Sequence, residues 1–305
     1  MLRAARDTAL DWYFAVRTAY PVWYNVLNRE AVQLHTEKEL PLSTESKRVV
    51  DELMRNGVAV SSLDALFPGK NWLEIFQTWE QANPPVEETR GKKQFLRQYW
   101  DLLPTLDFDN PFLRFSLDDE ILSIGHHYMG MWIRMRQYLL AKTIPEENLT
   151  PVQSQKWHRD PEEKKWFKCF VYLNDVDETA GPFTYALGSN WDGPYRNVGP
   201  QKARGGSYPP EGEVESKIPK ENIKVMTAKA GTVIFCDVAG LHFGGRATHK
   251  PRIMFTACYN APSFSEGSHF RWSDKARDVA KTLSPAAQYA LGGKTLTHKT
   301  GSMMG

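Results

Sequence analysis

The sequence predicts an α+β protein with helices in its first part and a jelly roll or barrel of short strands in its second part. Two observations carry this prediction. Up to about residue 130, apolar residues recur at helical spacing in several segments. From about residue 150, short apolar runs alternate with turn residues, which is typical of a core built from many short strands.

The helical segments differ in how clearly they begin and end. Pro21 interrupts the first, aromatic-rich helix or starts a second one. Ser43 begins a segment with the pattern of a capped helix, and the short apolar run 57–60 after it has the pattern of a strand. The charged stretch 86–98 fits a solvated loop or a surface helix. Helices are expected over residues 1–35, 43–56, 62–82 and 111–127.

Strands are expected over residues 135–144, 153–158, 167–173, 183–187, 223–227, 232–237 and 252–259. The segment 190–222 is rich in Gly, Pro and charge, has no clear periodicity, and is too long for a simple connection. It is a functional lid or an ordered insertion, and we predict a mobile lid. We expect one catalytic domain over 1–305, made of a mainly helical part (1–130), a jelly-roll core with the active centre (131–262) and a helical tail (263–305).

The composition is that of an ordinary soluble globular protein, with 41% hydrophobic and 24% charged residues. The net charge of +2 gives no reason to expect nucleic acid as a partner. No stretch reaches the ~18 apolar residues of a membrane span, and the N-terminus lacks the apolar run of a signal peptide. Cys169, Cys236 and Cys258 lie in apolar runs and suit buried thiols in a reducing compartment. We therefore expect a cytoplasmic protein.

A metal site is indicated by the stretch Trp157-His158-Arg159-Asp160. On an extended segment, side chains two residues apart point to the same face, so His158 and Asp160 would converge. His242 is the best candidate for a third ligand. Two histidines and one carboxylate on one side of a metal form the arrangement of non-haem Fe(II) oxygenases.

Further motifs follow in a fixed order along the chain. They are Leu173-Asn174-Asp175-Val176, Gly181-Pro182, Gly188-Ser189-Asn190, the strand led by Gly231, His242, and Arg252 ten residues later. Together with the His-Xaa-Asp stretch, this order resembles the phytanoyl-CoA dioxygenase-like family of Fe(II)/2-oxoglutarate-dependent oxygenases. The resemblance covers about residues 135–260. This chain departs from the family pattern at Asn190, where the family often has His. That position is usually taken as structural.

The resemblance implies a double-stranded β-helix (jelly roll, cupin-like) core with flanking helices. It also implies Fe(II) held by His158, Asp160 and His242, and 2-oxoglutarate and O2 as cosubstrates that yield succinate and CO2. Arg252 would hold the far carboxylate of 2-oxoglutarate, because a guanidinium matches a carboxylate in a planar fork. Arg246 is the rival for this role. Retention of Asp160 favours hydroxylation over halogenation, since related halogenases replace that carboxylate.

The remaining candidate residues are interpreted from their positions on a strand, a helix or a loop. If Arg252 points inward, so do Met254 and Thr256, whereas Ile253, Phe255 and Ala257 pack outward against helices. Phe170 and Tyr172 share a strand face and line the cavity or belong to the core. His126 and His127 are adjacent, so on a helix they face different ways, and we expect them to be structural. Three basic residues of the long loop meet an anionic substrate or are solvated: Arg196, Lys202 and Arg204.

Two other functions remain open at this stage. A jelly roll with zinc or manganese would use the same ligands for non-oxidative chemistry, and a binding protein would not turn over at all. The aromatic N-terminal helix packs on the domain, forms a homodimer or lies on a membrane surface. The substrate is a small molecule that the sequence does not identify.

Overall fold

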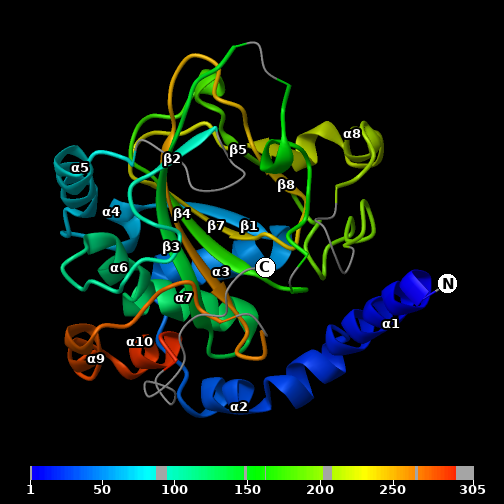
Figure 1. The fold of residues 1–305 in the computed structure, drawn as a ribbon, viewed down its shortest axis with the longest axis horizontal. Helices are drawn as coiled ribbons and strands as arrows, with labels where there is room; N and C mark the ends of the chain where they lie inside the picture. Colours follow the sequence, from blue (N-terminus) through cyan, green and yellow to red (C-terminus); the bar gives the residue numbers. More distant parts are fainter. Residues whose placement is uncertain are drawn as a thin grey trace.

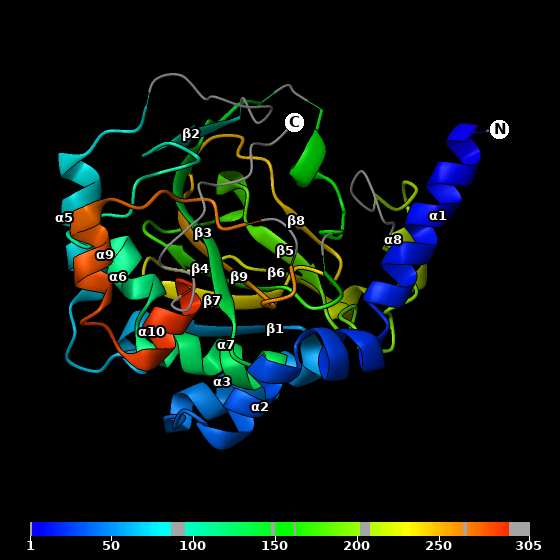
Figure 2. The same ribbon diagram turned by 60° about the horizontal axis from the view of Figure 1, so that its bottom comes forward.

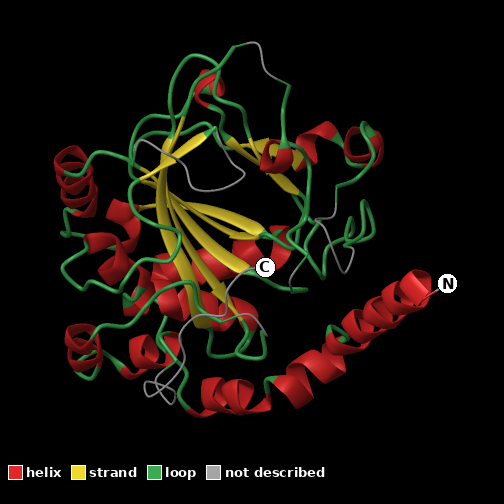
Figure 3. Ribbon diagram, viewed as in Figure 1, coloured by secondary structure: helices red, strands yellow, loops and turns green. Residues whose placement is uncertain are grey.

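The chain forms two antiparallel sheets surrounded by helices (Figures 1 and 3). The six-stranded sheet has the order β1-β7-β4-β9-β3-β2, and the three-stranded sheet has the order β6-β5-β8. The prediction of a mixed helical and antiparallel protein is confirmed. The strands are β1 Val58–Ser62, β2 Leu96–Gln98, β3 Arg134–Thr143, β4 Phe167–Tyr172, β5 Phe183–Ala186, β6 Ile223–Val225, β7 Thr232–Asp237, β8 His242–Gly244 and β9 Ile253–Asn260. This computed structural model describes residues 2–86, 95–147, 150–161, 163–201, 208–264 and 267–292.

The helices lie mainly before the strands and after them in the chain. Ser43 caps α3 as expected, because its side chain accepts a hydrogen bond from Ser46 N. Pro21 is the first residue of a separate helical segment, η1, so it starts a second helix. The helices are α1 Leu2–Arg17, η1 Pro21–Leu27, α2 Arg29–Glu37, α3 Thr44–Asn56, α4 Leu63–Leu66, α5 Trp72–Ala82, α6 Pro111–Ser116, α7 Asp119–Met129, α8 Glu213–Lys217, α9 Asp274–Ala280 and α10 Pro285–Ala290.

The single helix expected over 111–127 is wrong, because two helices, α6 and α7, occupy this stretch. Asp118 separates them. Its backbone is extended, and its side chain caps α7 by accepting a hydrogen bond from Glu120 N in the first turn of that helix. The helix expected over 62–82 is also divided, at a turn where Gly69 has φ +80°. In both places a local capping or turn signal interrupts a continuous apolar pattern.

The strand expected over 153–158 is wrong in its first half, where Gln153–Gln155 form one short helical turn. His158 forms only an isolated bridge to His242. Two short strands, β2 and β8, were not expected, because three residues are too few to display an alternating pattern.

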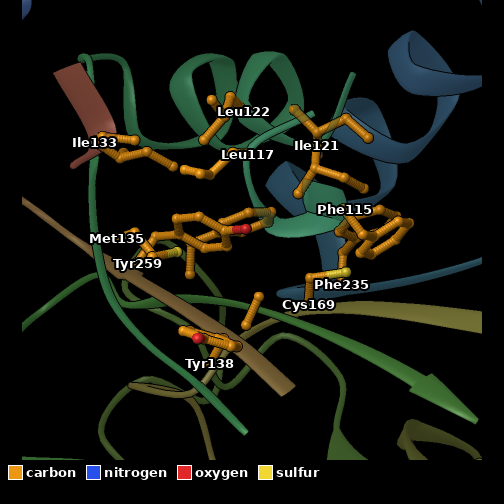
Figure 4. Packing of buried hydrophobic residues seen from close by; sticks show 14 of the residues in the cluster. Phe115, Leu117, Ile121, Leu122, Ile133, Met135, Tyr138, Cys169, Phe235 and Tyr259 are labelled. Atoms are coloured by element: carbon orange, nitrogen blue, oxygen red, sulfur yellow. The ribbon is translucent and has the colours of Figure 1, made fainter. Parts of the chain in front are cut away.

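One face of the six-stranded sheet packs against helices and forms the larger core (Figure 2). Figure 4 shows side chains of α7 and the preceding turn, among them Leu117 and Ile121, above Met135 of β3 and Tyr259 of β9. Along β9 the alternation is as predicted from an inward Arg252. Phe255 and Ala257 belong to this helix-side core, whereas Met254 and Cys258 belong to a second core.

The second core lies between the two sheets and supports the candidate site. It contains Phe170 and Tyr172 of β4 together with Phe183 and Tyr185 of β5. Cys169, Cys236 and Cys258 are buried free thiols, as expected. The described helices include none that is long and apolar enough to cross a membrane.

The segment 190–222 is partly packed onto the protein body. Val198, Val214 and Ile218 are buried in a third cluster with Leu241. Residues 202–207 of the segment lie outside the described residues. Much of the segment is therefore an ordered insertion, and its opening and closing as a lid stays a prediction.

The N-terminal helix α1 runs along one side of the molecule (Figures 1 and 2). Its C-terminal end is fixed by Arg17, which donates hydrogen bonds to Glu163 Oε1 at 2.9 Å and to Ser263 O at 2.8 Å. Trp23 of η1 donates to the other oxygen of the buried Glu163 at 2.5 Å. This contact joins the N-terminal helices to the loop that follows Asp160.

Candidate metal centre

The structure brings His158, Asp160 and His242 together between the two sheets. The two histidines exchange both backbone N–H···O hydrogen bonds, each 3.0 Å long, and their ring centroids are 4.2 Å apart. Asp160 Oδ1 lies 3.6 Å from His158 Nε2. One ligand atom from each of the three residues lies within 4.8 Å of the others. The three side chains are therefore close enough together that they could hold one metal ion.

Each imidazole is held in one tautomer by its own backbone. His158 Nδ1 lies 2.8 Å from Lys156 O, and His242 Nδ1 lies 3.0 Å from Gly240 O. A carbonyl oxygen only accepts, so each Nδ1 carries the proton and each Nε2 keeps a lone pair for a metal. Burial, with the neighbouring His158, lowers the pKa of His242 to about 3, so this ligand is neutral at physiological pH.

Asp160 is kept ionised by the cation beside it. Lys168 Nζ of β4 lies 2.7 Å from Asp160 Oδ2. Burial alone would raise the pKa of Asp160, but Lys168 and the two imidazoles hold it well below its usual value. Because Lys168 binds Oδ2, the other oxygen is the one that faces the histidines. The sequence interpretation gave Lys168 no role, although its position two residues before Phe170 places it on the same strand face.

Arg159 points away from the metal ligands, as the alternation predicts, and fixes the surrounding loops. Its buried guanidinium donates to six backbone carbonyls. The acceptors are Ser189, Tyr195, Arg196, Val198, Gly199 and Ala239. These hydrogen bonds therefore attach the first part of the segment 190–222 to the stretch 157–160, on the side opposite to His158 and Asp160.

The turn that carries His242 is fixed by the buried Asp237 at the end of β7. Its Oδ1 accepts hydrogen bonds from the backbone N–H groups of Trp166 at 2.9 Å and of Ala239 at 3.0 Å. Its Oδ2 accepts from the Tyr128 hydroxyl at 2.7 Å. These bonds satisfy a buried carboxylate and leave the turn little freedom.

Arg252 is buried beside this centre. Its guanidinium donates to Gly181 O and contacts the hydroxyl of Tyr172, and its Nε has no hydrogen-bond partner within the described ranges. Gly244 leaves room for it, because a Cβ there would lie 3.4 Å from Arg252 Nη2. Among the described residues, no carboxylate pairs with Arg252. Arg246, its rival, is only partly buried.

The remaining predicted cavity residues lie on the inner face of the larger sheet. Phe170 of β4 is directly opposite Thr256 of β9. Phe170 packs against Phe183 with ring centroids 5.0 Å apart, and Phe183 lies 5.7 Å from His242. Tyr208, from the segment 190–222, stacks on His158 with centroids 5.8 Å apart. No motif or spacing in the sequence indicated Tyr208.

Of Arg196, Lys202 and Arg204, the structure describes Arg196 alone. Arg196 lines a separate cavity of about 390 Å³, together with Arg159, Lys164 and Trp191. Lys202 and Arg204 lie outside the described residues.

The donor set fits a divalent transition metal. Two imidazoles and one ionised carboxylate on one side leave the opposite side open for further ligands, which suits Fe(II) in oxygenases. The backbone carbonyls on both Nδ1 atoms and Lys168 on Asp160 supply the outer contacts that orient such ligands.

Neither protein-family models nor curated proteins match this chain. Solved structures do. EctD from S. alaskensis with bound Fe matches at a TM-score of 0.52 and 18% identity, covering 76% of this chain and 82% of that chain. The same protein with 2-oxoglutarate and 5-hydroxyectoine matches at 0.51 and 17%, covering 74% and 79%. The epimerase SnoN with Fe3+, alpha ketoglutarate and nogalamycin RO matches at 0.49 and 16%, covering 70% and 83%. The likeness to EctD shows that this chain shares its fold.

Proposed function

We propose that this protein is an Fe(II)- and 2-oxoglutarate-dependent dioxygenase that hydroxylates a small molecule and releases succinate and CO2. One observation carries the proposal: two imidazoles and an ionised carboxylate converge beside a buried arginine that no described carboxylate neutralises. A plain metal site gives no reason to bury Arg252. A cosubstrate with a free carboxylate does.

Each residue of the centre has a distinct task in this function. His158, Asp160 and His242 hold Fe(II), which with 2-oxoglutarate and O2 supplies the oxidising power for hydroxylation. Arg252 binds the far carboxylate of 2-oxoglutarate, with Tyr172 and Thr256 beside it. Lys168 orients Asp160, so that one carboxylate oxygen faces the metal. Phe170 and Phe183 exclude water from the inner side of the centre.

The fold supports the same function. EctD has been solved with Fe and with 2-oxoglutarate, and this chain shares its fold. The core packed between the two sheets supports a double-stranded β-helix. We place the chain with the phytanoyl-CoA dioxygenase-like enzymes as a proposal that rests on the order of its motifs. Asp160 favours hydroxylation over halogenation.

We also propose a cytoplasmic enzyme that forms a homodimer through α1. The support is the exposed aromatic surface of this helix, where Trp12 is 71% and Tyr13 is 63% exposed. Sedimentation of the protein and of its Trp12→Ser/Tyr13→Ser variant tests the dimer. Identical monomer mass in both would exclude it.

The function is tested with the purified protein, Fe(II) and 2-oxoglutarate in the absence of oxygen. We expect the weak visible charge-transfer band of the iron–2-oxoglutarate chelate, and its loss in His242→Ala. With oxygen, candidate small molecules are screened for coupled succinate release. A protein that binds Fe(II) tightly but never gives the band would contradict the proposal and favour non-oxidative metal chemistry.

A further inference from the structure

A second cluster of two histidines and one carboxylate lies at the junction of α2 and α7. His35 belongs to α2, Glu39 follows two residues after its end, and His127 lies in the last turn of α7. The two rings meet edge to face with centroids 5.0 Å apart. One ligand atom of each residue lies within 4.8 Å of the others. None of these residues belongs to the centre between the sheets.

The hydrogen bonds leave two acceptor atoms facing each other. His127 Nε2 lies 2.8 Å from Leu40 O, so it carries a proton, and in the neutral ring Nδ1 keeps the lone pair. This Nδ1 faces Glu39 Oε1 at 3.5 Å. Two acceptors repel unless a proton or a metal cation lies between them. Ligands of tetrahedral Zn²⁺, at bond lengths of ~2.0–2.2 Å, are separated by about 3.3–3.6 Å.

The third residue of the cluster, His35, has a ring nitrogen without a hydrogen-bond partner among the described residues. Nδ1 of His35 is buried and has no hydrogen-bond partner in the described part of the chain. Both helices end at the cluster, and helix C-termini favour positive charge.

We propose that His35, Glu39 and His127 form a second metal site that takes Zn²⁺ or a similar borderline divalent ion and links α2 to α7. Three protein ligands leave the fourth tetrahedral position to water. The site lies at the surface, where Glu39 has 65% of its side chain exposed. It does not depend on the oxygenase function, because it shares no residue with that centre.

The experiment measures Zn²⁺ binding by equilibrium dialysis in a variant that lacks the first centre, His158→Ala/His242→Ala. We expect this background to bind one Zn²⁺ per chain at micromolar free metal. Adding Glu39→Gln should weaken binding at least tenfold, and adding His35→Ala should weaken it further. Glu37→Gln is the matched control, because it removes an exposed carboxylate of α2 that accepts a hydrogen bond from Gln33. It should leave the affinity unchanged.

Two results would overturn the site. The first is a background that binds no Zn²⁺ at tens of micromolar free metal, as expected if a proton, and not a metal, lies between His127 and Glu39. The second is equal weakening of binding by Glu39→Gln and Glu37→Gln, which would indicate nonspecific attraction. Co²⁺ in place of Zn²⁺ gives a second readout, since a tetrahedral site absorbs strongly in the visible range. Glu39 is the main test position because its exposed side chain can be changed without loss of the fold.

Discussion

The two histidine–carboxylate clusters of this protein have the same donor set and opposite surroundings. His158, Asp160 and His242 come from extended segments, and paired backbone hydrogen bonds join the two histidines. His35, Glu39 and His127 come from the ends of two helices, and their carboxylate is exposed. The first cluster lies in a buried core, and the second at the surface.

The difference concerns what surrounds the donors. At the buried cluster, Lys168 holds the carboxylate and Arg252 adds a second buried cation. At the surface cluster, His127 Nε2 contacts the backbone carbonyl of Leu40. The donor set selects the kind of metal, whereas a dry pocket with a carboxylate clamp decides whether redox chemistry with a cosubstrate follows. Substitutions at the two clusters, and at the residues around the buried one, test this distinction.

The largest effect is expected from removing a ligand of the buried cluster. His242→Ala should abolish succinate release while the far-UV circular dichroism stays unchanged, because one ligand of three cannot be replaced by water without loss of the metal. The counterpart His35→Ala should keep activity within about twofold. An active His242→Ala protein, or an inactive but folded His35→Ala protein, would reverse the assignment of the two clusters.

Loss of Arg252 should weaken the binding of 2-oxoglutarate and leave the binding of iron unchanged. Arg252→Gln should weaken 2-oxoglutarate binding by about two to four decades, since breaking a buried ion pair costs roughly 3–5 kcal/mol. The affinity is measured by titration of the charge-transfer band, with the iron content checked. Arg246→Gln is the control. A large loss only in the Arg246 variant would move the clamp there.

Loss of the arginine behind the centre should loosen the segment 190–222. Arg159→Met removes charge-assisted hydrogen bonds to six carbonyls and should cost about 2–4 kcal/mol of stability. Limited proteolysis should then cut this segment faster than in the parent protein. In the parent, Fe(II), 2-oxoglutarate and the right substrate together should protect it. Unchanged cutting with all three bound would argue against a lid.

The smallest effect concerns Lys168. Lys168→Met should weaken Fe(II) binding by about 10- to 100-fold, the range for residues that orient a metal ligand. The buried Asp160 then loses the cation that keeps it ionised and fixes its Oδ2. Lys224→Met, at an exposed position on β6, is the control for charge. Equal affinities in the two variants would show that the ion pair of Lys168 does not position Asp160.

The buried cluster was predictable because its signals are local. Alternation along an extended segment places His158 and Asp160 on one face and Arg159 on the other, and the same rule orients Met254 and Phe255 of β9. The helix over 43–56 was predictable for the same reason, since its cap and its apolar spacing lie within a few residues. The helix expected over 111–127 failed because the cap at Asp118 outweighs a continuous apolar pattern.

The surface cluster was not predictable from the chain. His126 and His127 were interpreted as structural because adjacent residues diverge on a helix. His126 is buried against Trp132. His127 meets His35, from a helix far away in sequence, and no local spacing indicates that contact.

The sequence by itself determined the face on which each side chain lies, because periods of two and 3.6 residues follow from backbone geometry. It thereby determined that His158 and Asp160 share a face. The tertiary structure decided which faces meet. It brought Lys168 to Asp160, six loop carbonyls to Arg159 and α2 to α7. Such contacts depend on how distant segments pack, and no local spacing encodes that.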